Sequence, residues 1–433
     1  MQSDFKKLGE ICLKITDGSH FSPKEMAGGI PMYSVKDMTP YGFSDESVKR
    51  ISDADYETLK KSDCAPKHGD VLIAKDGSVL KHVFSVERET RSAILSSIAI
   101  LRPNTQLVDS KYLSYALQDP TLRSEILANY VSGSGVPRIV LKDFKEISIR
   151  IPDLRSQKAA AKILGAIDNC MKSKIDLTKK YELLAQCIFR SWFIDFDPVK
   201  AKMSGKQPVG LNSSAASLFP DSMFQSEIGL IPTSWSVKTI GAALSVSGGT
   251  TPSTANGDYW GGDHLWTTPK DLSVLESVLS NRSSRKLTDL GLKSISSGAI
   301  PKHSVIMSCR APIGYLAINS EPTAVNQGCI TLANSQLYPP FFVLNWLRAN
   351  MQEIKARAGG TTFEEISRTS FKDLPFLNPG IEVLAFYASI SNLILELIAI
   401  TAKCIETLNA IKEDLLPRLM SGELQIPEEM LES

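Results

Sequence analysis

Residues 69–80, GDVLIAKDGSVL, form a short apolar run that ends in a turn of small and charged residues, and HSVIMSCRAPIG at 303–314 repeats this pattern. Further segments recur at a similar spacing, namely AILSSIAIL at 93–101 as AVNQGCITL at 324–332, KYLSYAL at 111–117 as FFVLNWL at 341–347, and Lys142-Asp143-Phe144 as Lys372-Asp373-Leu374. Each series ends in a long helical segment, at 155–193 and at 381–420. A duplication of this size predicts two similar modules with pseudo-twofold symmetry, which suits the reading of two related targets at a fixed separation.

The composition is that of an ordinary globular chain. Its 433 residues, 43% hydrophobic and 22% charged, suffice for two domains of about 150 residues each plus connecting helices. The net charge of +1 means that binding to nucleic acid would depend on local basic stripes or on a partner. Seven cysteines without a CxxC pair favour reduced thiols in a cytoplasmic protein.

Neither end of the chain reads as a membrane element. The first ten residues, MQSDFKKLGE, lack the apolar stretch of a signal peptide. The most apolar run, Val383 to Leu395, is shorter than the roughly 18 residues that span a bilayer. We therefore expect a buried helix face there and no membrane partner.

The segments between the repeats predict mixed α and β modules. In residues 1–153, β-branched runs such as Val71-Leu72-Ile73 alternate with Gly and Pro turns, and one internal helix is expected at 112–129. The second module is expected at 234–379. Residues 198–233 are rich in Pro, Gly and Ser and predict a partly ordered surface linker.

Both long segments carry apolar side chains at alternating steps of three and four residues, the seam of a coiled coil. The seam residues are Ile167, Met171, Leu177, Tyr181, Leu184 and Ile188 in the first helix, and Leu397, Thr401, Cys404, Leu408, Ile411 and Leu415 in the second. At 1.5 Å per residue, about 38 residues make a rod of roughly 55–60 Å. Because a whole module separates the two helices, they can pair with each other in antiparallel fashion. The sequence thus predicts an α+β fold of two α/β modules separated by an antiparallel coiled coil.

No catalytic or metal-binding motif stands out. Tyr338-Pro339-Pro340-Phe341 looks like the Asn/Asp-Pro-Pro-Tyr/Phe motif of amino-methyltransferases, but tyrosine replaces the residue that must accept hydrogen bonds from the target amino group. The chain has no Gly-Lys-Ser/Thr phosphate loop, and its five histidines lie at no metal-ligand spacing. We predict a chain that binds without catalysing and holds no metal or cofactor of its own.

Polar and basic residues near aromatic ones gather at matching places in both modules. Glycine lets a backbone approach a phosphate, Ser and Thr supply short donors, and Lys or Arg supply charge or bidentate contacts to guanine. The alternative is that the Gly-Ser-Gly segment is only a turn and each Lys-Asp a solvated pair, but recurrence in both halves favours binding. The candidate DNA-binding residues are Tyr33, Lys36, Lys75, Ser78, Ser134, Arg138 and Lys142, and Trp266, Thr268, Lys270, Arg310, Arg357, Thr361, Thr362 and Arg368.

The chain resembles the specificity subunit of type I restriction-modification enzymes over essentially its whole length. The segments that carry the resemblance are KLGE at 7–10, GSGVPRIVLKDF at 133–144, the passage from Ile151-Pro152 to Ile163-Leu164, IFRSWFIDFDPV at 188–199, and LLPRLMSGEL at 415–424. The sequence departs from the pattern at Phe363-Glu364-Glu365-Ile366, where the first module has Pro137-Arg138-Ile139. We do not expect Glu364 or Glu365 to face a phosphate.

The resemblance implies two target-recognition domains, 1–153 and 234–379, each reading one half of a gapped, asymmetric sequence in double-stranded DNA. Spacer helices at 154–197 and 380–422, followed by a tail at 423–433, would set the gap and dock the modification subunits, expected to number two. Those partners would carry S-adenosylmethionine and methylate adenine, and ATP-dependent restriction subunits with helicase and nuclease activity would join afterwards.

Two other functions stay open at this point. One is a two-module protein scaffold that does not bind DNA. The other is a DNA methyltransferase or nuclease in its own right.

Overall fold

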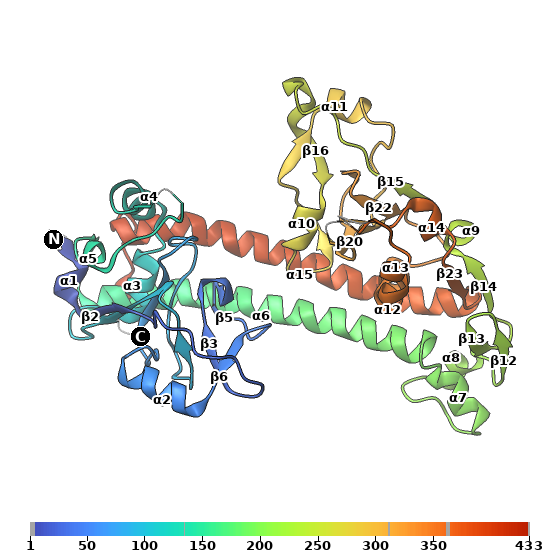
Figure 1. Ribbon diagram of the computed structural model, residues 1–433, viewed down its shortest axis with the longest axis horizontal. Coiled ribbons are helices and arrows are strands. Elements are labelled where there is room, and N and C mark those ends of the chain that lie inside the picture. The colour runs from blue at the N-terminus through green and yellow to red at the C-terminus, as the bar shows by residue number, and fades with distance from the viewer. Residues whose placement is uncertain (1–4, 134, 311, 361–363, 432–433) are drawn as a thin grey trace. The chain divides into compact units, whose positions relative to one another are not determined.

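The computed structural model describes residues 5–133, 135–310, 312–360 and 364–431 (Figure 1). The chain divides into two compact units: unit 1 contains residues 1–173 and 404–433, and unit 2 contains residues 174–403. Each unit therefore combines one repeated module with part of each long helix. The sequence boundaries, in contrast, treat the helices as separate segments.

Unit 1 is built around the four-stranded sheet β2-β10-β7-β8, with a second sheet, β6-β3-β9, and two small pairs, β1-β11 and β4-β5. The elements of its module are β1 (Phe5–Lys7), α1 (Leu8–Ile11), β2 (Cys12–Asp17), β3 (Ile30–Tyr33), the 3₁₀ turn η1 (Val35–Asp37), β4 (Met38–Thr39), β5 (Gly42–Phe43), β6 (Lys49–Ile51), α2 (Asp53–Lys61), β7 (Val71–Ala74), β8 (Val83–Ser85), β9 (Ala93–Ile94), β10 (Ile98–Pro103), α3 (Ser110–Ala116), α4 (Pro120–Asn129), α5 (Leu141–Phe144) and β11 (Ser148–Arg150). Every residue of β7 is buried, as expected for a central strand whose side chains are apolar on both faces.

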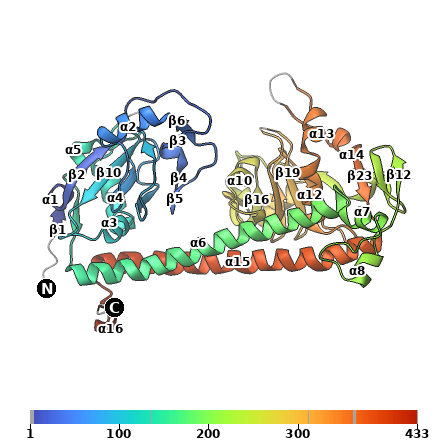
Figure 2. The same cartoon turned by 90° about the horizontal axis from the view of Figure 1, so that it is seen from below.

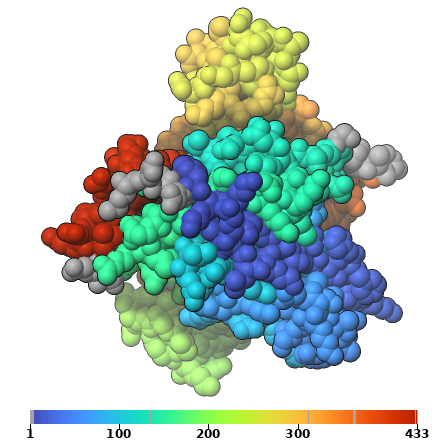
Figure 3. Space-filling model, turned by 90° about the vertical axis from the view of Figure 1, so that its left-hand side faces the viewer, coloured from blue at the N-terminus to red at the C-terminus, as the bar shows by residue number. Residues whose placement is uncertain are grey.

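The N-terminal strand closes the module of unit 1. Phe5 of β1 pairs with Arg150 of β11, and the Lys7 ammonium donates to the Glu146 carboxylate at 2.6 Å. On the surface of this unit, the blue N-terminal residues lie beside the blue-green residues of the segment that contains α5 (Figure 3). The first and last strands of the module thus meet just before the long helix begins.

Unit 2 has the five-stranded sheet β15-β22-β19-β20-β17, the sheet β18-β16-β21 and the pairs β14-β23 and β12-β13. Its elements, apart from the long helices, are α7 (Asp197–Met203), α8 (Ser213–Ser217), β12 (Met223–Ser226), β13 (Gly229–Pro232), β14 (Ser236–Thr239), α9 (Ile240–Ala243), β15 (Val246–Gly248), η2 (Gly257–Tyr259), β16 (Trp260–Thr267), α10 (Pro269–Ser273), β17 (Leu279–Ser280), β18 (Arg285–Leu287), α11 (Asp289–Lys293), β19 (Val305–Ser308), β20 (Leu316–Asn319), β21 (Thr323–Val325), β22 (Cys329–Leu332), α12 (Pro340–Ala349), α13 (Met351–Ala356), α14 (Arg368–Lys372) and β23 (Pro375–Asn378). Four of these elements, α7, α8, β12 and β13, lie in the predicted linker, so that segment is more ordered than its composition indicates.

The two modules share one topology, as the repeats predict. The order β2-β10-β7-β8 recurs as β15-β22-β19-β20, and the parallel pair β3-β9 recurs as β16-β21. Gly18 and Gly249 mark the same position after the first sheet strand. A Cβ at Gly18 would stand 2.3 Å from the Ile94 carbonyl oxygen, and one at Gly249 would stand 2.2 Å from that of Asn326. Only glycine fits either position, because the backbones approach too closely for a side chain.

Two long helices connect the modules. They are α6 (Leu154–Phe193), 40 residues long, and α15 (Ile381–Ser421), 41 residues long, and unit 1 also contains the short helix α16 (Glu428–Leu431). Within each unit the two helices lie side by side (Figures 1 and 2). In unit 2 the Trp192 ring of α6 stacks on Phe386 of α15 with centroids 5.4 Å apart, and the Phe189 and Tyr387 centroids are 6.5 Å apart. The colours show that the chain runs in opposite directions along α6 and α15, so the helices are antiparallel there (Figure 1).

The predicted seam residues differ in their surroundings. Met171 and Thr401 are buried, but Leu184 and Ile411 are 49% and 42% exposed and do not belong to the packed interior. The remaining seam residues are half-buried, namely Ile167, Leu177, Tyr181, Ile188, Leu397, Cys404, Leu408 and Leu415. Around Leu184 the helix packs instead through Ala185 and the large aromatic side chains, which a heptad pattern of aliphatic residues does not indicate.

The internal helix expected at 112–129 is two helices. α3 ends at Ala116, and α4 begins at Pro120. The Asp119 side chain accepts a hydrogen bond from the Leu122 backbone N–H at 2.9 Å, and proline occupies the first helical position. An Asp-Pro pair of this kind starts a new helix, so the apolar pattern alone was misleading.

The apolar stretch of α15 is longer than the sequence analysis expected. An 18-residue window of this helix has a mean hydropathy of 2.0. By length and composition alone, the helix could therefore cross a bilayer. Of that window, 39% is buried, and Val383, Leu384 and Tyr387 lie in the core of unit 2. Leu393 and Ile400, seven residues apart, are 56% and 66% exposed and form an apolar strip on the outer face.

Candidate nucleic-acid interface

The first repeated cluster is a short helical turn pinned by an aspartate. In unit 1 the backbone N–H and the hydroxyl of Ser34 both donate to Asp37 at 2.8 Å. In unit 2 Thr268 makes the same two bonds to Asp271, at 2.9 and 2.6 Å. Burial would raise the pKa of Asp271, but hydrogen bonds from Thr268 and Ser284 outweigh it and hold the pKa below its usual value.

Each of these turns carries an exposed lysine immediately before the aspartate. Lys36 and Lys270 occupy equivalent positions, and neither side chain forms a hydrogen bond or ion pair with another of the residues that the structure describes. The Thr268 hydroxyl caps the N-terminus of α10, where it accepts a hydrogen bond from the Asp271 N–H. The turn therefore presents one positive charge at the same place in both units.

The aromatic candidates of this cluster are core residues. Tyr33 is 7% exposed, its hydroxyl donates to Asp45 at 2.7 Å, and its ring stacks on Phe43. Trp266 is 4% exposed, and its indole N–H donates to the Thr250 carbonyl oxygen at 3.2 Å. The structure gives both rings a packing role and leaves neither an open face for a base.

Trp266 of unit 2 occupies the position of Met32 in unit 1, one residue before Tyr33. Met32 pairs with Ala93 in the parallel ladder of unit 1, and Trp266 pairs with Ala324 in that of unit 2. Ala93 and Ala324 are equivalent in the repeat, so Trp266 corresponds to Met32. Lys36 and Lys270 each lie four residues beyond these positions, so the two lysines are equivalent as well.

In each unit the loop after a central strand, which carries Lys75 or Arg310, meets a later segment in a backbone bridge. In unit 1 the loop after β7 bridges at Asp76 to Arg138, and in unit 2 the loop after β19 bridges at Arg310 to Glu365. The next residues repeat the geometry, because Ile139 N–H donates to Lys75 and Ile366 N–H donates to Cys309, both at 3.1 Å. Arg138 thus corresponds to Glu365, and Asp76 to Arg310, so the charges at the bridge are exchanged between the units.

Two of the basic candidate DNA-binding residues already have carboxylate partners inside the protein. Lys75 is 7% exposed, and its ammonium lies 3.2 Å from Asp17 and 3.3 Å from Asp76. The Arg310 guanidinium lies 3.7 Å from the Glu365 carboxylate. In this structure the charge of Lys75 is buried and neutralised inside the protein.

Each unit keeps one exposed arginine near its bridge. The side chains of Arg138 and Arg368 form no hydrogen bond or ion pair within the described ranges, and both are exposed. Arg368 lies across Gly248, where a Cβ would stand 3.0 Å from the arginine Cδ. Gly248 occupies the position of Asp17 in the other unit, as the pairings of β2 and β15 with their neighbours show.

The remaining candidates are less constrained. Ser78 and Lys142 are exposed, and Arg357 is exposed but donates to Glu353 at 2.8 Å. Ser134, Thr361 and Thr362 lie outside the described residues. The sequence reasoning missed Asp17, since nothing in the sequence places a carboxylate so far upstream beside Lys75.

The described residues around these turns and bridges form no catalytic arrangement. Within the part of the chain that the structure describes, no group of three or more His, Cys, Asp or Glu side chains could hold a metal ion. Tyr338 is 2% exposed and its hydroxyl donates to Asn378 at 2.9 Å, so the Tyr-Pro-Pro-Phe segment is core. Burial raises the pKa of the Cys309 thiol to about 11, which makes it a poor nucleophile at neutral pH.

Comparison with known proteins agrees with the duplicated fold. The sequence model of the type I restriction modification DNA specificity domain matches twice, at residues 2–183 and 232–409. The type I restriction enzyme HindI specificity subunit of Haemophilus influenzae is 24% identical over 404 residues, which are 83% of this chain and 87% of the relative. The putative type I restriction enzyme MjaX specificity subunit of Methanocaldococcus jannaschii is 23% identical over 397 residues, 86% of this chain and 82% of the relative.

A solved structure shares the fold. The crystal structure of the type I restriction-modification system S subunit from M. genitalium superposes with a TM-score of 0.54 at 13% identity, covering 98% of this chain and 96% of that one. The family's sequence model covers both modules. The chain therefore belongs to the type I restriction-modification DNA specificity family and carries two copies of its domain.

Proposed function

We propose that this chain is the DNA-recognition subunit of a type I restriction-modification complex and that each unit reads one half of a bipartite, gapped target. The observation that supports this most directly is the repeated turn with its exposed lysine, Lys36 in unit 1 and Lys270 in unit 2. A cation held at one place in each of two similar modules suits the contact of two phosphates. As a specificity subunit, the chain is a recognition component and not an enzyme.

The paired and unpaired charges divide the candidate residues into two roles. Lys36, Lys142 and Lys270 contact phosphates, and Arg138 and Arg368 reach base edges or phosphates, because their charges are exposed and unpaired. Lys75 and Arg310 hold the loops after β7 and β19 in shape through their carboxylate partners. Differences between the two bridges then let the units read different half-sites.

The long helices set the distance between the half-sites and dock the partner subunits. A rod of roughly 55–60 Å covers about one and a half turns of B-DNA. The exposed apolar strip at Leu393 and Ile400 supports docking of modification subunits, expected to number two. Those subunits would supply S-adenosylmethionine chemistry, and ATP-driven restriction subunits would complete the assembly in the cytoplasm.

An electrophoretic shift assay tests the proposal against its alternatives. The full chain, alone and with its modification partner, is titrated into duplex DNA between about 50 and 200 mM salt. We expect a shift that weakens steeply with salt and tightens when the partner is present. A shift that is absent under all conditions would favour the protein scaffold, and saturable binding of S-adenosylmethionine by the isolated chain would favour an enzyme.

A further inference from the structure

Among the described residues, no strand pairs with the outer edge of β8 in unit 1, whereas a strand covers the same edge in unit 2. The two edges correspond residue by residue. Val86 N–H donates to the Asp70 carbonyl and Gly69 N–H donates to the Val86 carbonyl. In unit 2 the Asn319 N–H donates to the Ser304 carbonyl, and the His303 N–H donates to the Asn319 carbonyl, so the same two bonds recur. Because N–H groups alternate in direction along an antiparallel strand, the N–H of Ser85 and that of Ile318 both point away from the sheet.

In unit 2 this edge is paired within the chain. Strand β17 runs parallel to β20, with Ile318 N–H donating to Val278 at 2.7 Å and Ser320 N–H donating to Ser280 at 3.0 Å. The Val278 N–H in turn donates to the Glu182 carboxylate of α6 at 2.8 Å. An extended segment with aliphatic side chains therefore fills the space between sheet and helix.

In unit 1 the equivalent donors, the backbone N–H groups of Ser85 and Glu87, have no partner among the residues that the structure describes. A cavity of about 560 Å³ opens beside them instead. It is lined by β8, by the β4-β5 hairpin and by Asp168, Asn169 and Lys172 of α6. An unpaired edge next to a cavity of this size is open to strand addition.

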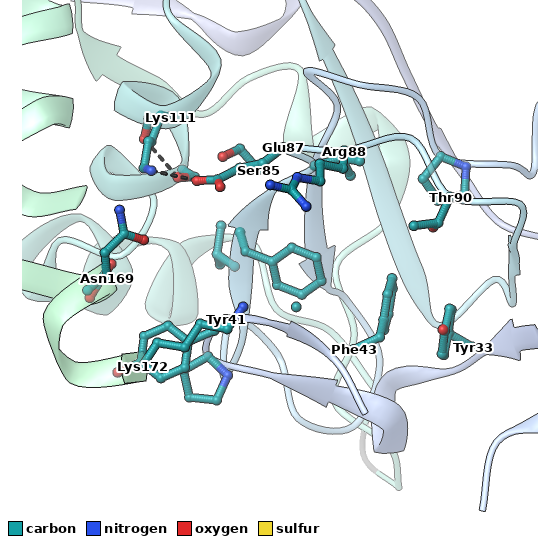
Figure 4. Close-up of a pocket in the computed structure, with 18 of the residues that line it drawn as sticks. Tyr33, Tyr41, Phe43, Ser85, Glu87, Arg88, Thr90, Lys111, Asn169 and Lys172 are labelled. Carbon is teal, nitrogen blue, oxygen red and sulfur yellow. Dashed lines mark hydrogen bonds and ion pairs between the residues drawn. The ribbon is translucent and has the colours of Figure 1, made fainter. Parts of the chain in front are cut away.

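The side chains of the cavity define what can fill it. Tyr33 and Phe43 stack with centroids 4.0 Å apart, and Phe84 meets Phe43 edge-on at 5.2 Å. Figure 4 shows Asn169 and Lys172 on the helix side and the Phe43 and Tyr33 rings on the sheet side, with Arg88 between them. The partly exposed rings of Phe43 and Phe84 offer apolar contact to alternate side chains of an inserted strand.

The charges of the cavity do not balance. Glu87 accepts from Lys111 at 2.5 Å and Asp168 accepts from Lys412 at 2.8 Å, so these two charges are paired, whereas Asp45 keeps its charge because it accepts from the neutral Tyr33 hydroxyl. Arg88 and Lys172 are exposed and form no hydrogen bond or ion pair with any described residue. Arg88 and Lys172 together exceed the charge of Asp45 by one positive charge, which favours an acidic occupant.

We propose that the β8 edge of unit 1 docks an extended segment of a partner protein, one with aliphatic side chains and a carboxylate, which pairs parallel to β8 as β17 pairs with β20. This docking site is separate from the DNA-binding role and does not depend on it. The segment Ser273–Asn281, SVLESVLSN, has the required chemistry and supplies a probe.

The test is fluorescence anisotropy of the labelled peptide SVLESVLSN with the full chain. We expect saturable binding that the Ser85→Pro variant weakens by about tenfold, because proline removes the outward donor of an edge strand. The matched Ser85→Ala variant keeps the donor and should bind like the original chain. The Lys172→Glu variant should bind this peptide more weakly. It should bind a peptide that carries Glu276→Lys more tightly than the original chain does.

Hydrogen exchange with the original chain provides a second measurement that needs no variant. Saturation with the peptide should slow exchange in residues 83–88. The absence of saturable binding, equal binding by a folded Ser85→Pro variant, or protection elsewhere than 83–88 would overturn the proposal. Self-association of the chain that Ser85→Pro abolishes would identify a second copy as the occupant and would also overturn it.

Discussion

Lys412 of α15 donates hydrogen bonds to both carboxylate oxygens of Asp168 of α6, at 2.8 and 3.0 Å. Tyr115 donates to the same carboxylate at 2.7 Å, and Gln118 accepts from Lys412 at 3.3 Å. The Lys412 and Asp168 side chains are only 15% and 16% exposed. This ion pair joins the two long helices inside unit 1, and its additional hydrogen bonds satisfy both partners.

Lys412→Met should destabilise unit 1 by about 2–4 kcal/mol, because it leaves a mostly buried carboxylate without its counter-ion. The urea midpoint for loss of hydrogen-exchange protection in residues 160–172 measures the effect. Lys7→Met is the matched control: its 2.6 Å pair with Glu146 is 52% and 57% exposed, and the midpoint should not move. Equal shifts for the two variants would show that burial does not govern the pair.

Gly18→Ala and Gly249→Ala should destabilise their own units by similar amounts, about 2–4 kcal/mol, because each new Cβ would collide with backbone. Gly257→Ala is the control, since a Cβ there meets nothing within 4 Å. The urea midpoint of each unit, followed by hydrogen exchange in β10 and β22, checks this. A tolerated alanine at either position would contradict the equivalence of the two modules.

Unit 1 should lose stability in acid through Asp63. Burial opposes the charge of this carboxylate, but hydrogen bonds from Lys14, Arg102 and Lys67 outweigh it and hold the pKa well below the usual value of 3.8. A depressed folded-state pKa contributes stability above the unfolded value, and this is lost as the pH falls through the folded one. The urea midpoint of unit 1 should therefore decrease as the pH is lowered below about 4, and it should decrease less in the Asp63→Asn variant. Parallel curves for the two proteins would rule Asp63 out.

Arg138→Ala and Arg368→Ala should each weaken DNA binding. Each should also reduce the slope of log affinity against log salt by about one, the value for one lost phosphate contact. Lys75→Met should instead lower the stability of unit 1, because it leaves Asp17 and Asp76 without their buried cation. Shift assays at several salt concentrations and urea unfolding separate the two effects. An unchanged salt slope in both arginine variants would remove them from the interface.

The architecture could be predicted because it depends on patterns that lie within short segments. The run around Val71 and its copy around Val305 are central strands in both units, and the long helices begin within a residue of the expected positions. The break before Pro120 could also have been found, since Asp119 and Pro120 together are a helix-start signal. The sequence analysis expected one helix at 112–129 because the apolar residues follow one helical period across the break.

The roles of the charged residues could be predicted only in part. Lys36 and Lys75 both precede an aspartate, yet Lys36 is exposed and Lys75 is buried. The difference comes from Asp17, which the pairing of β2 with β10 brings to the sheet beside Lys75. Such a contact joins segments far apart in the sequence, and a single sequence does not reveal it.

The central claim is that each unit reads its own half of the target. The most direct measurement replaces residues 1–153 with the corresponding module of another specificity subunit and sequences the methylated sites in cells that express the complete complex. We predict that one half of the bipartite target changes while the other half and the gap stay the same. A change in both halves would contradict the account.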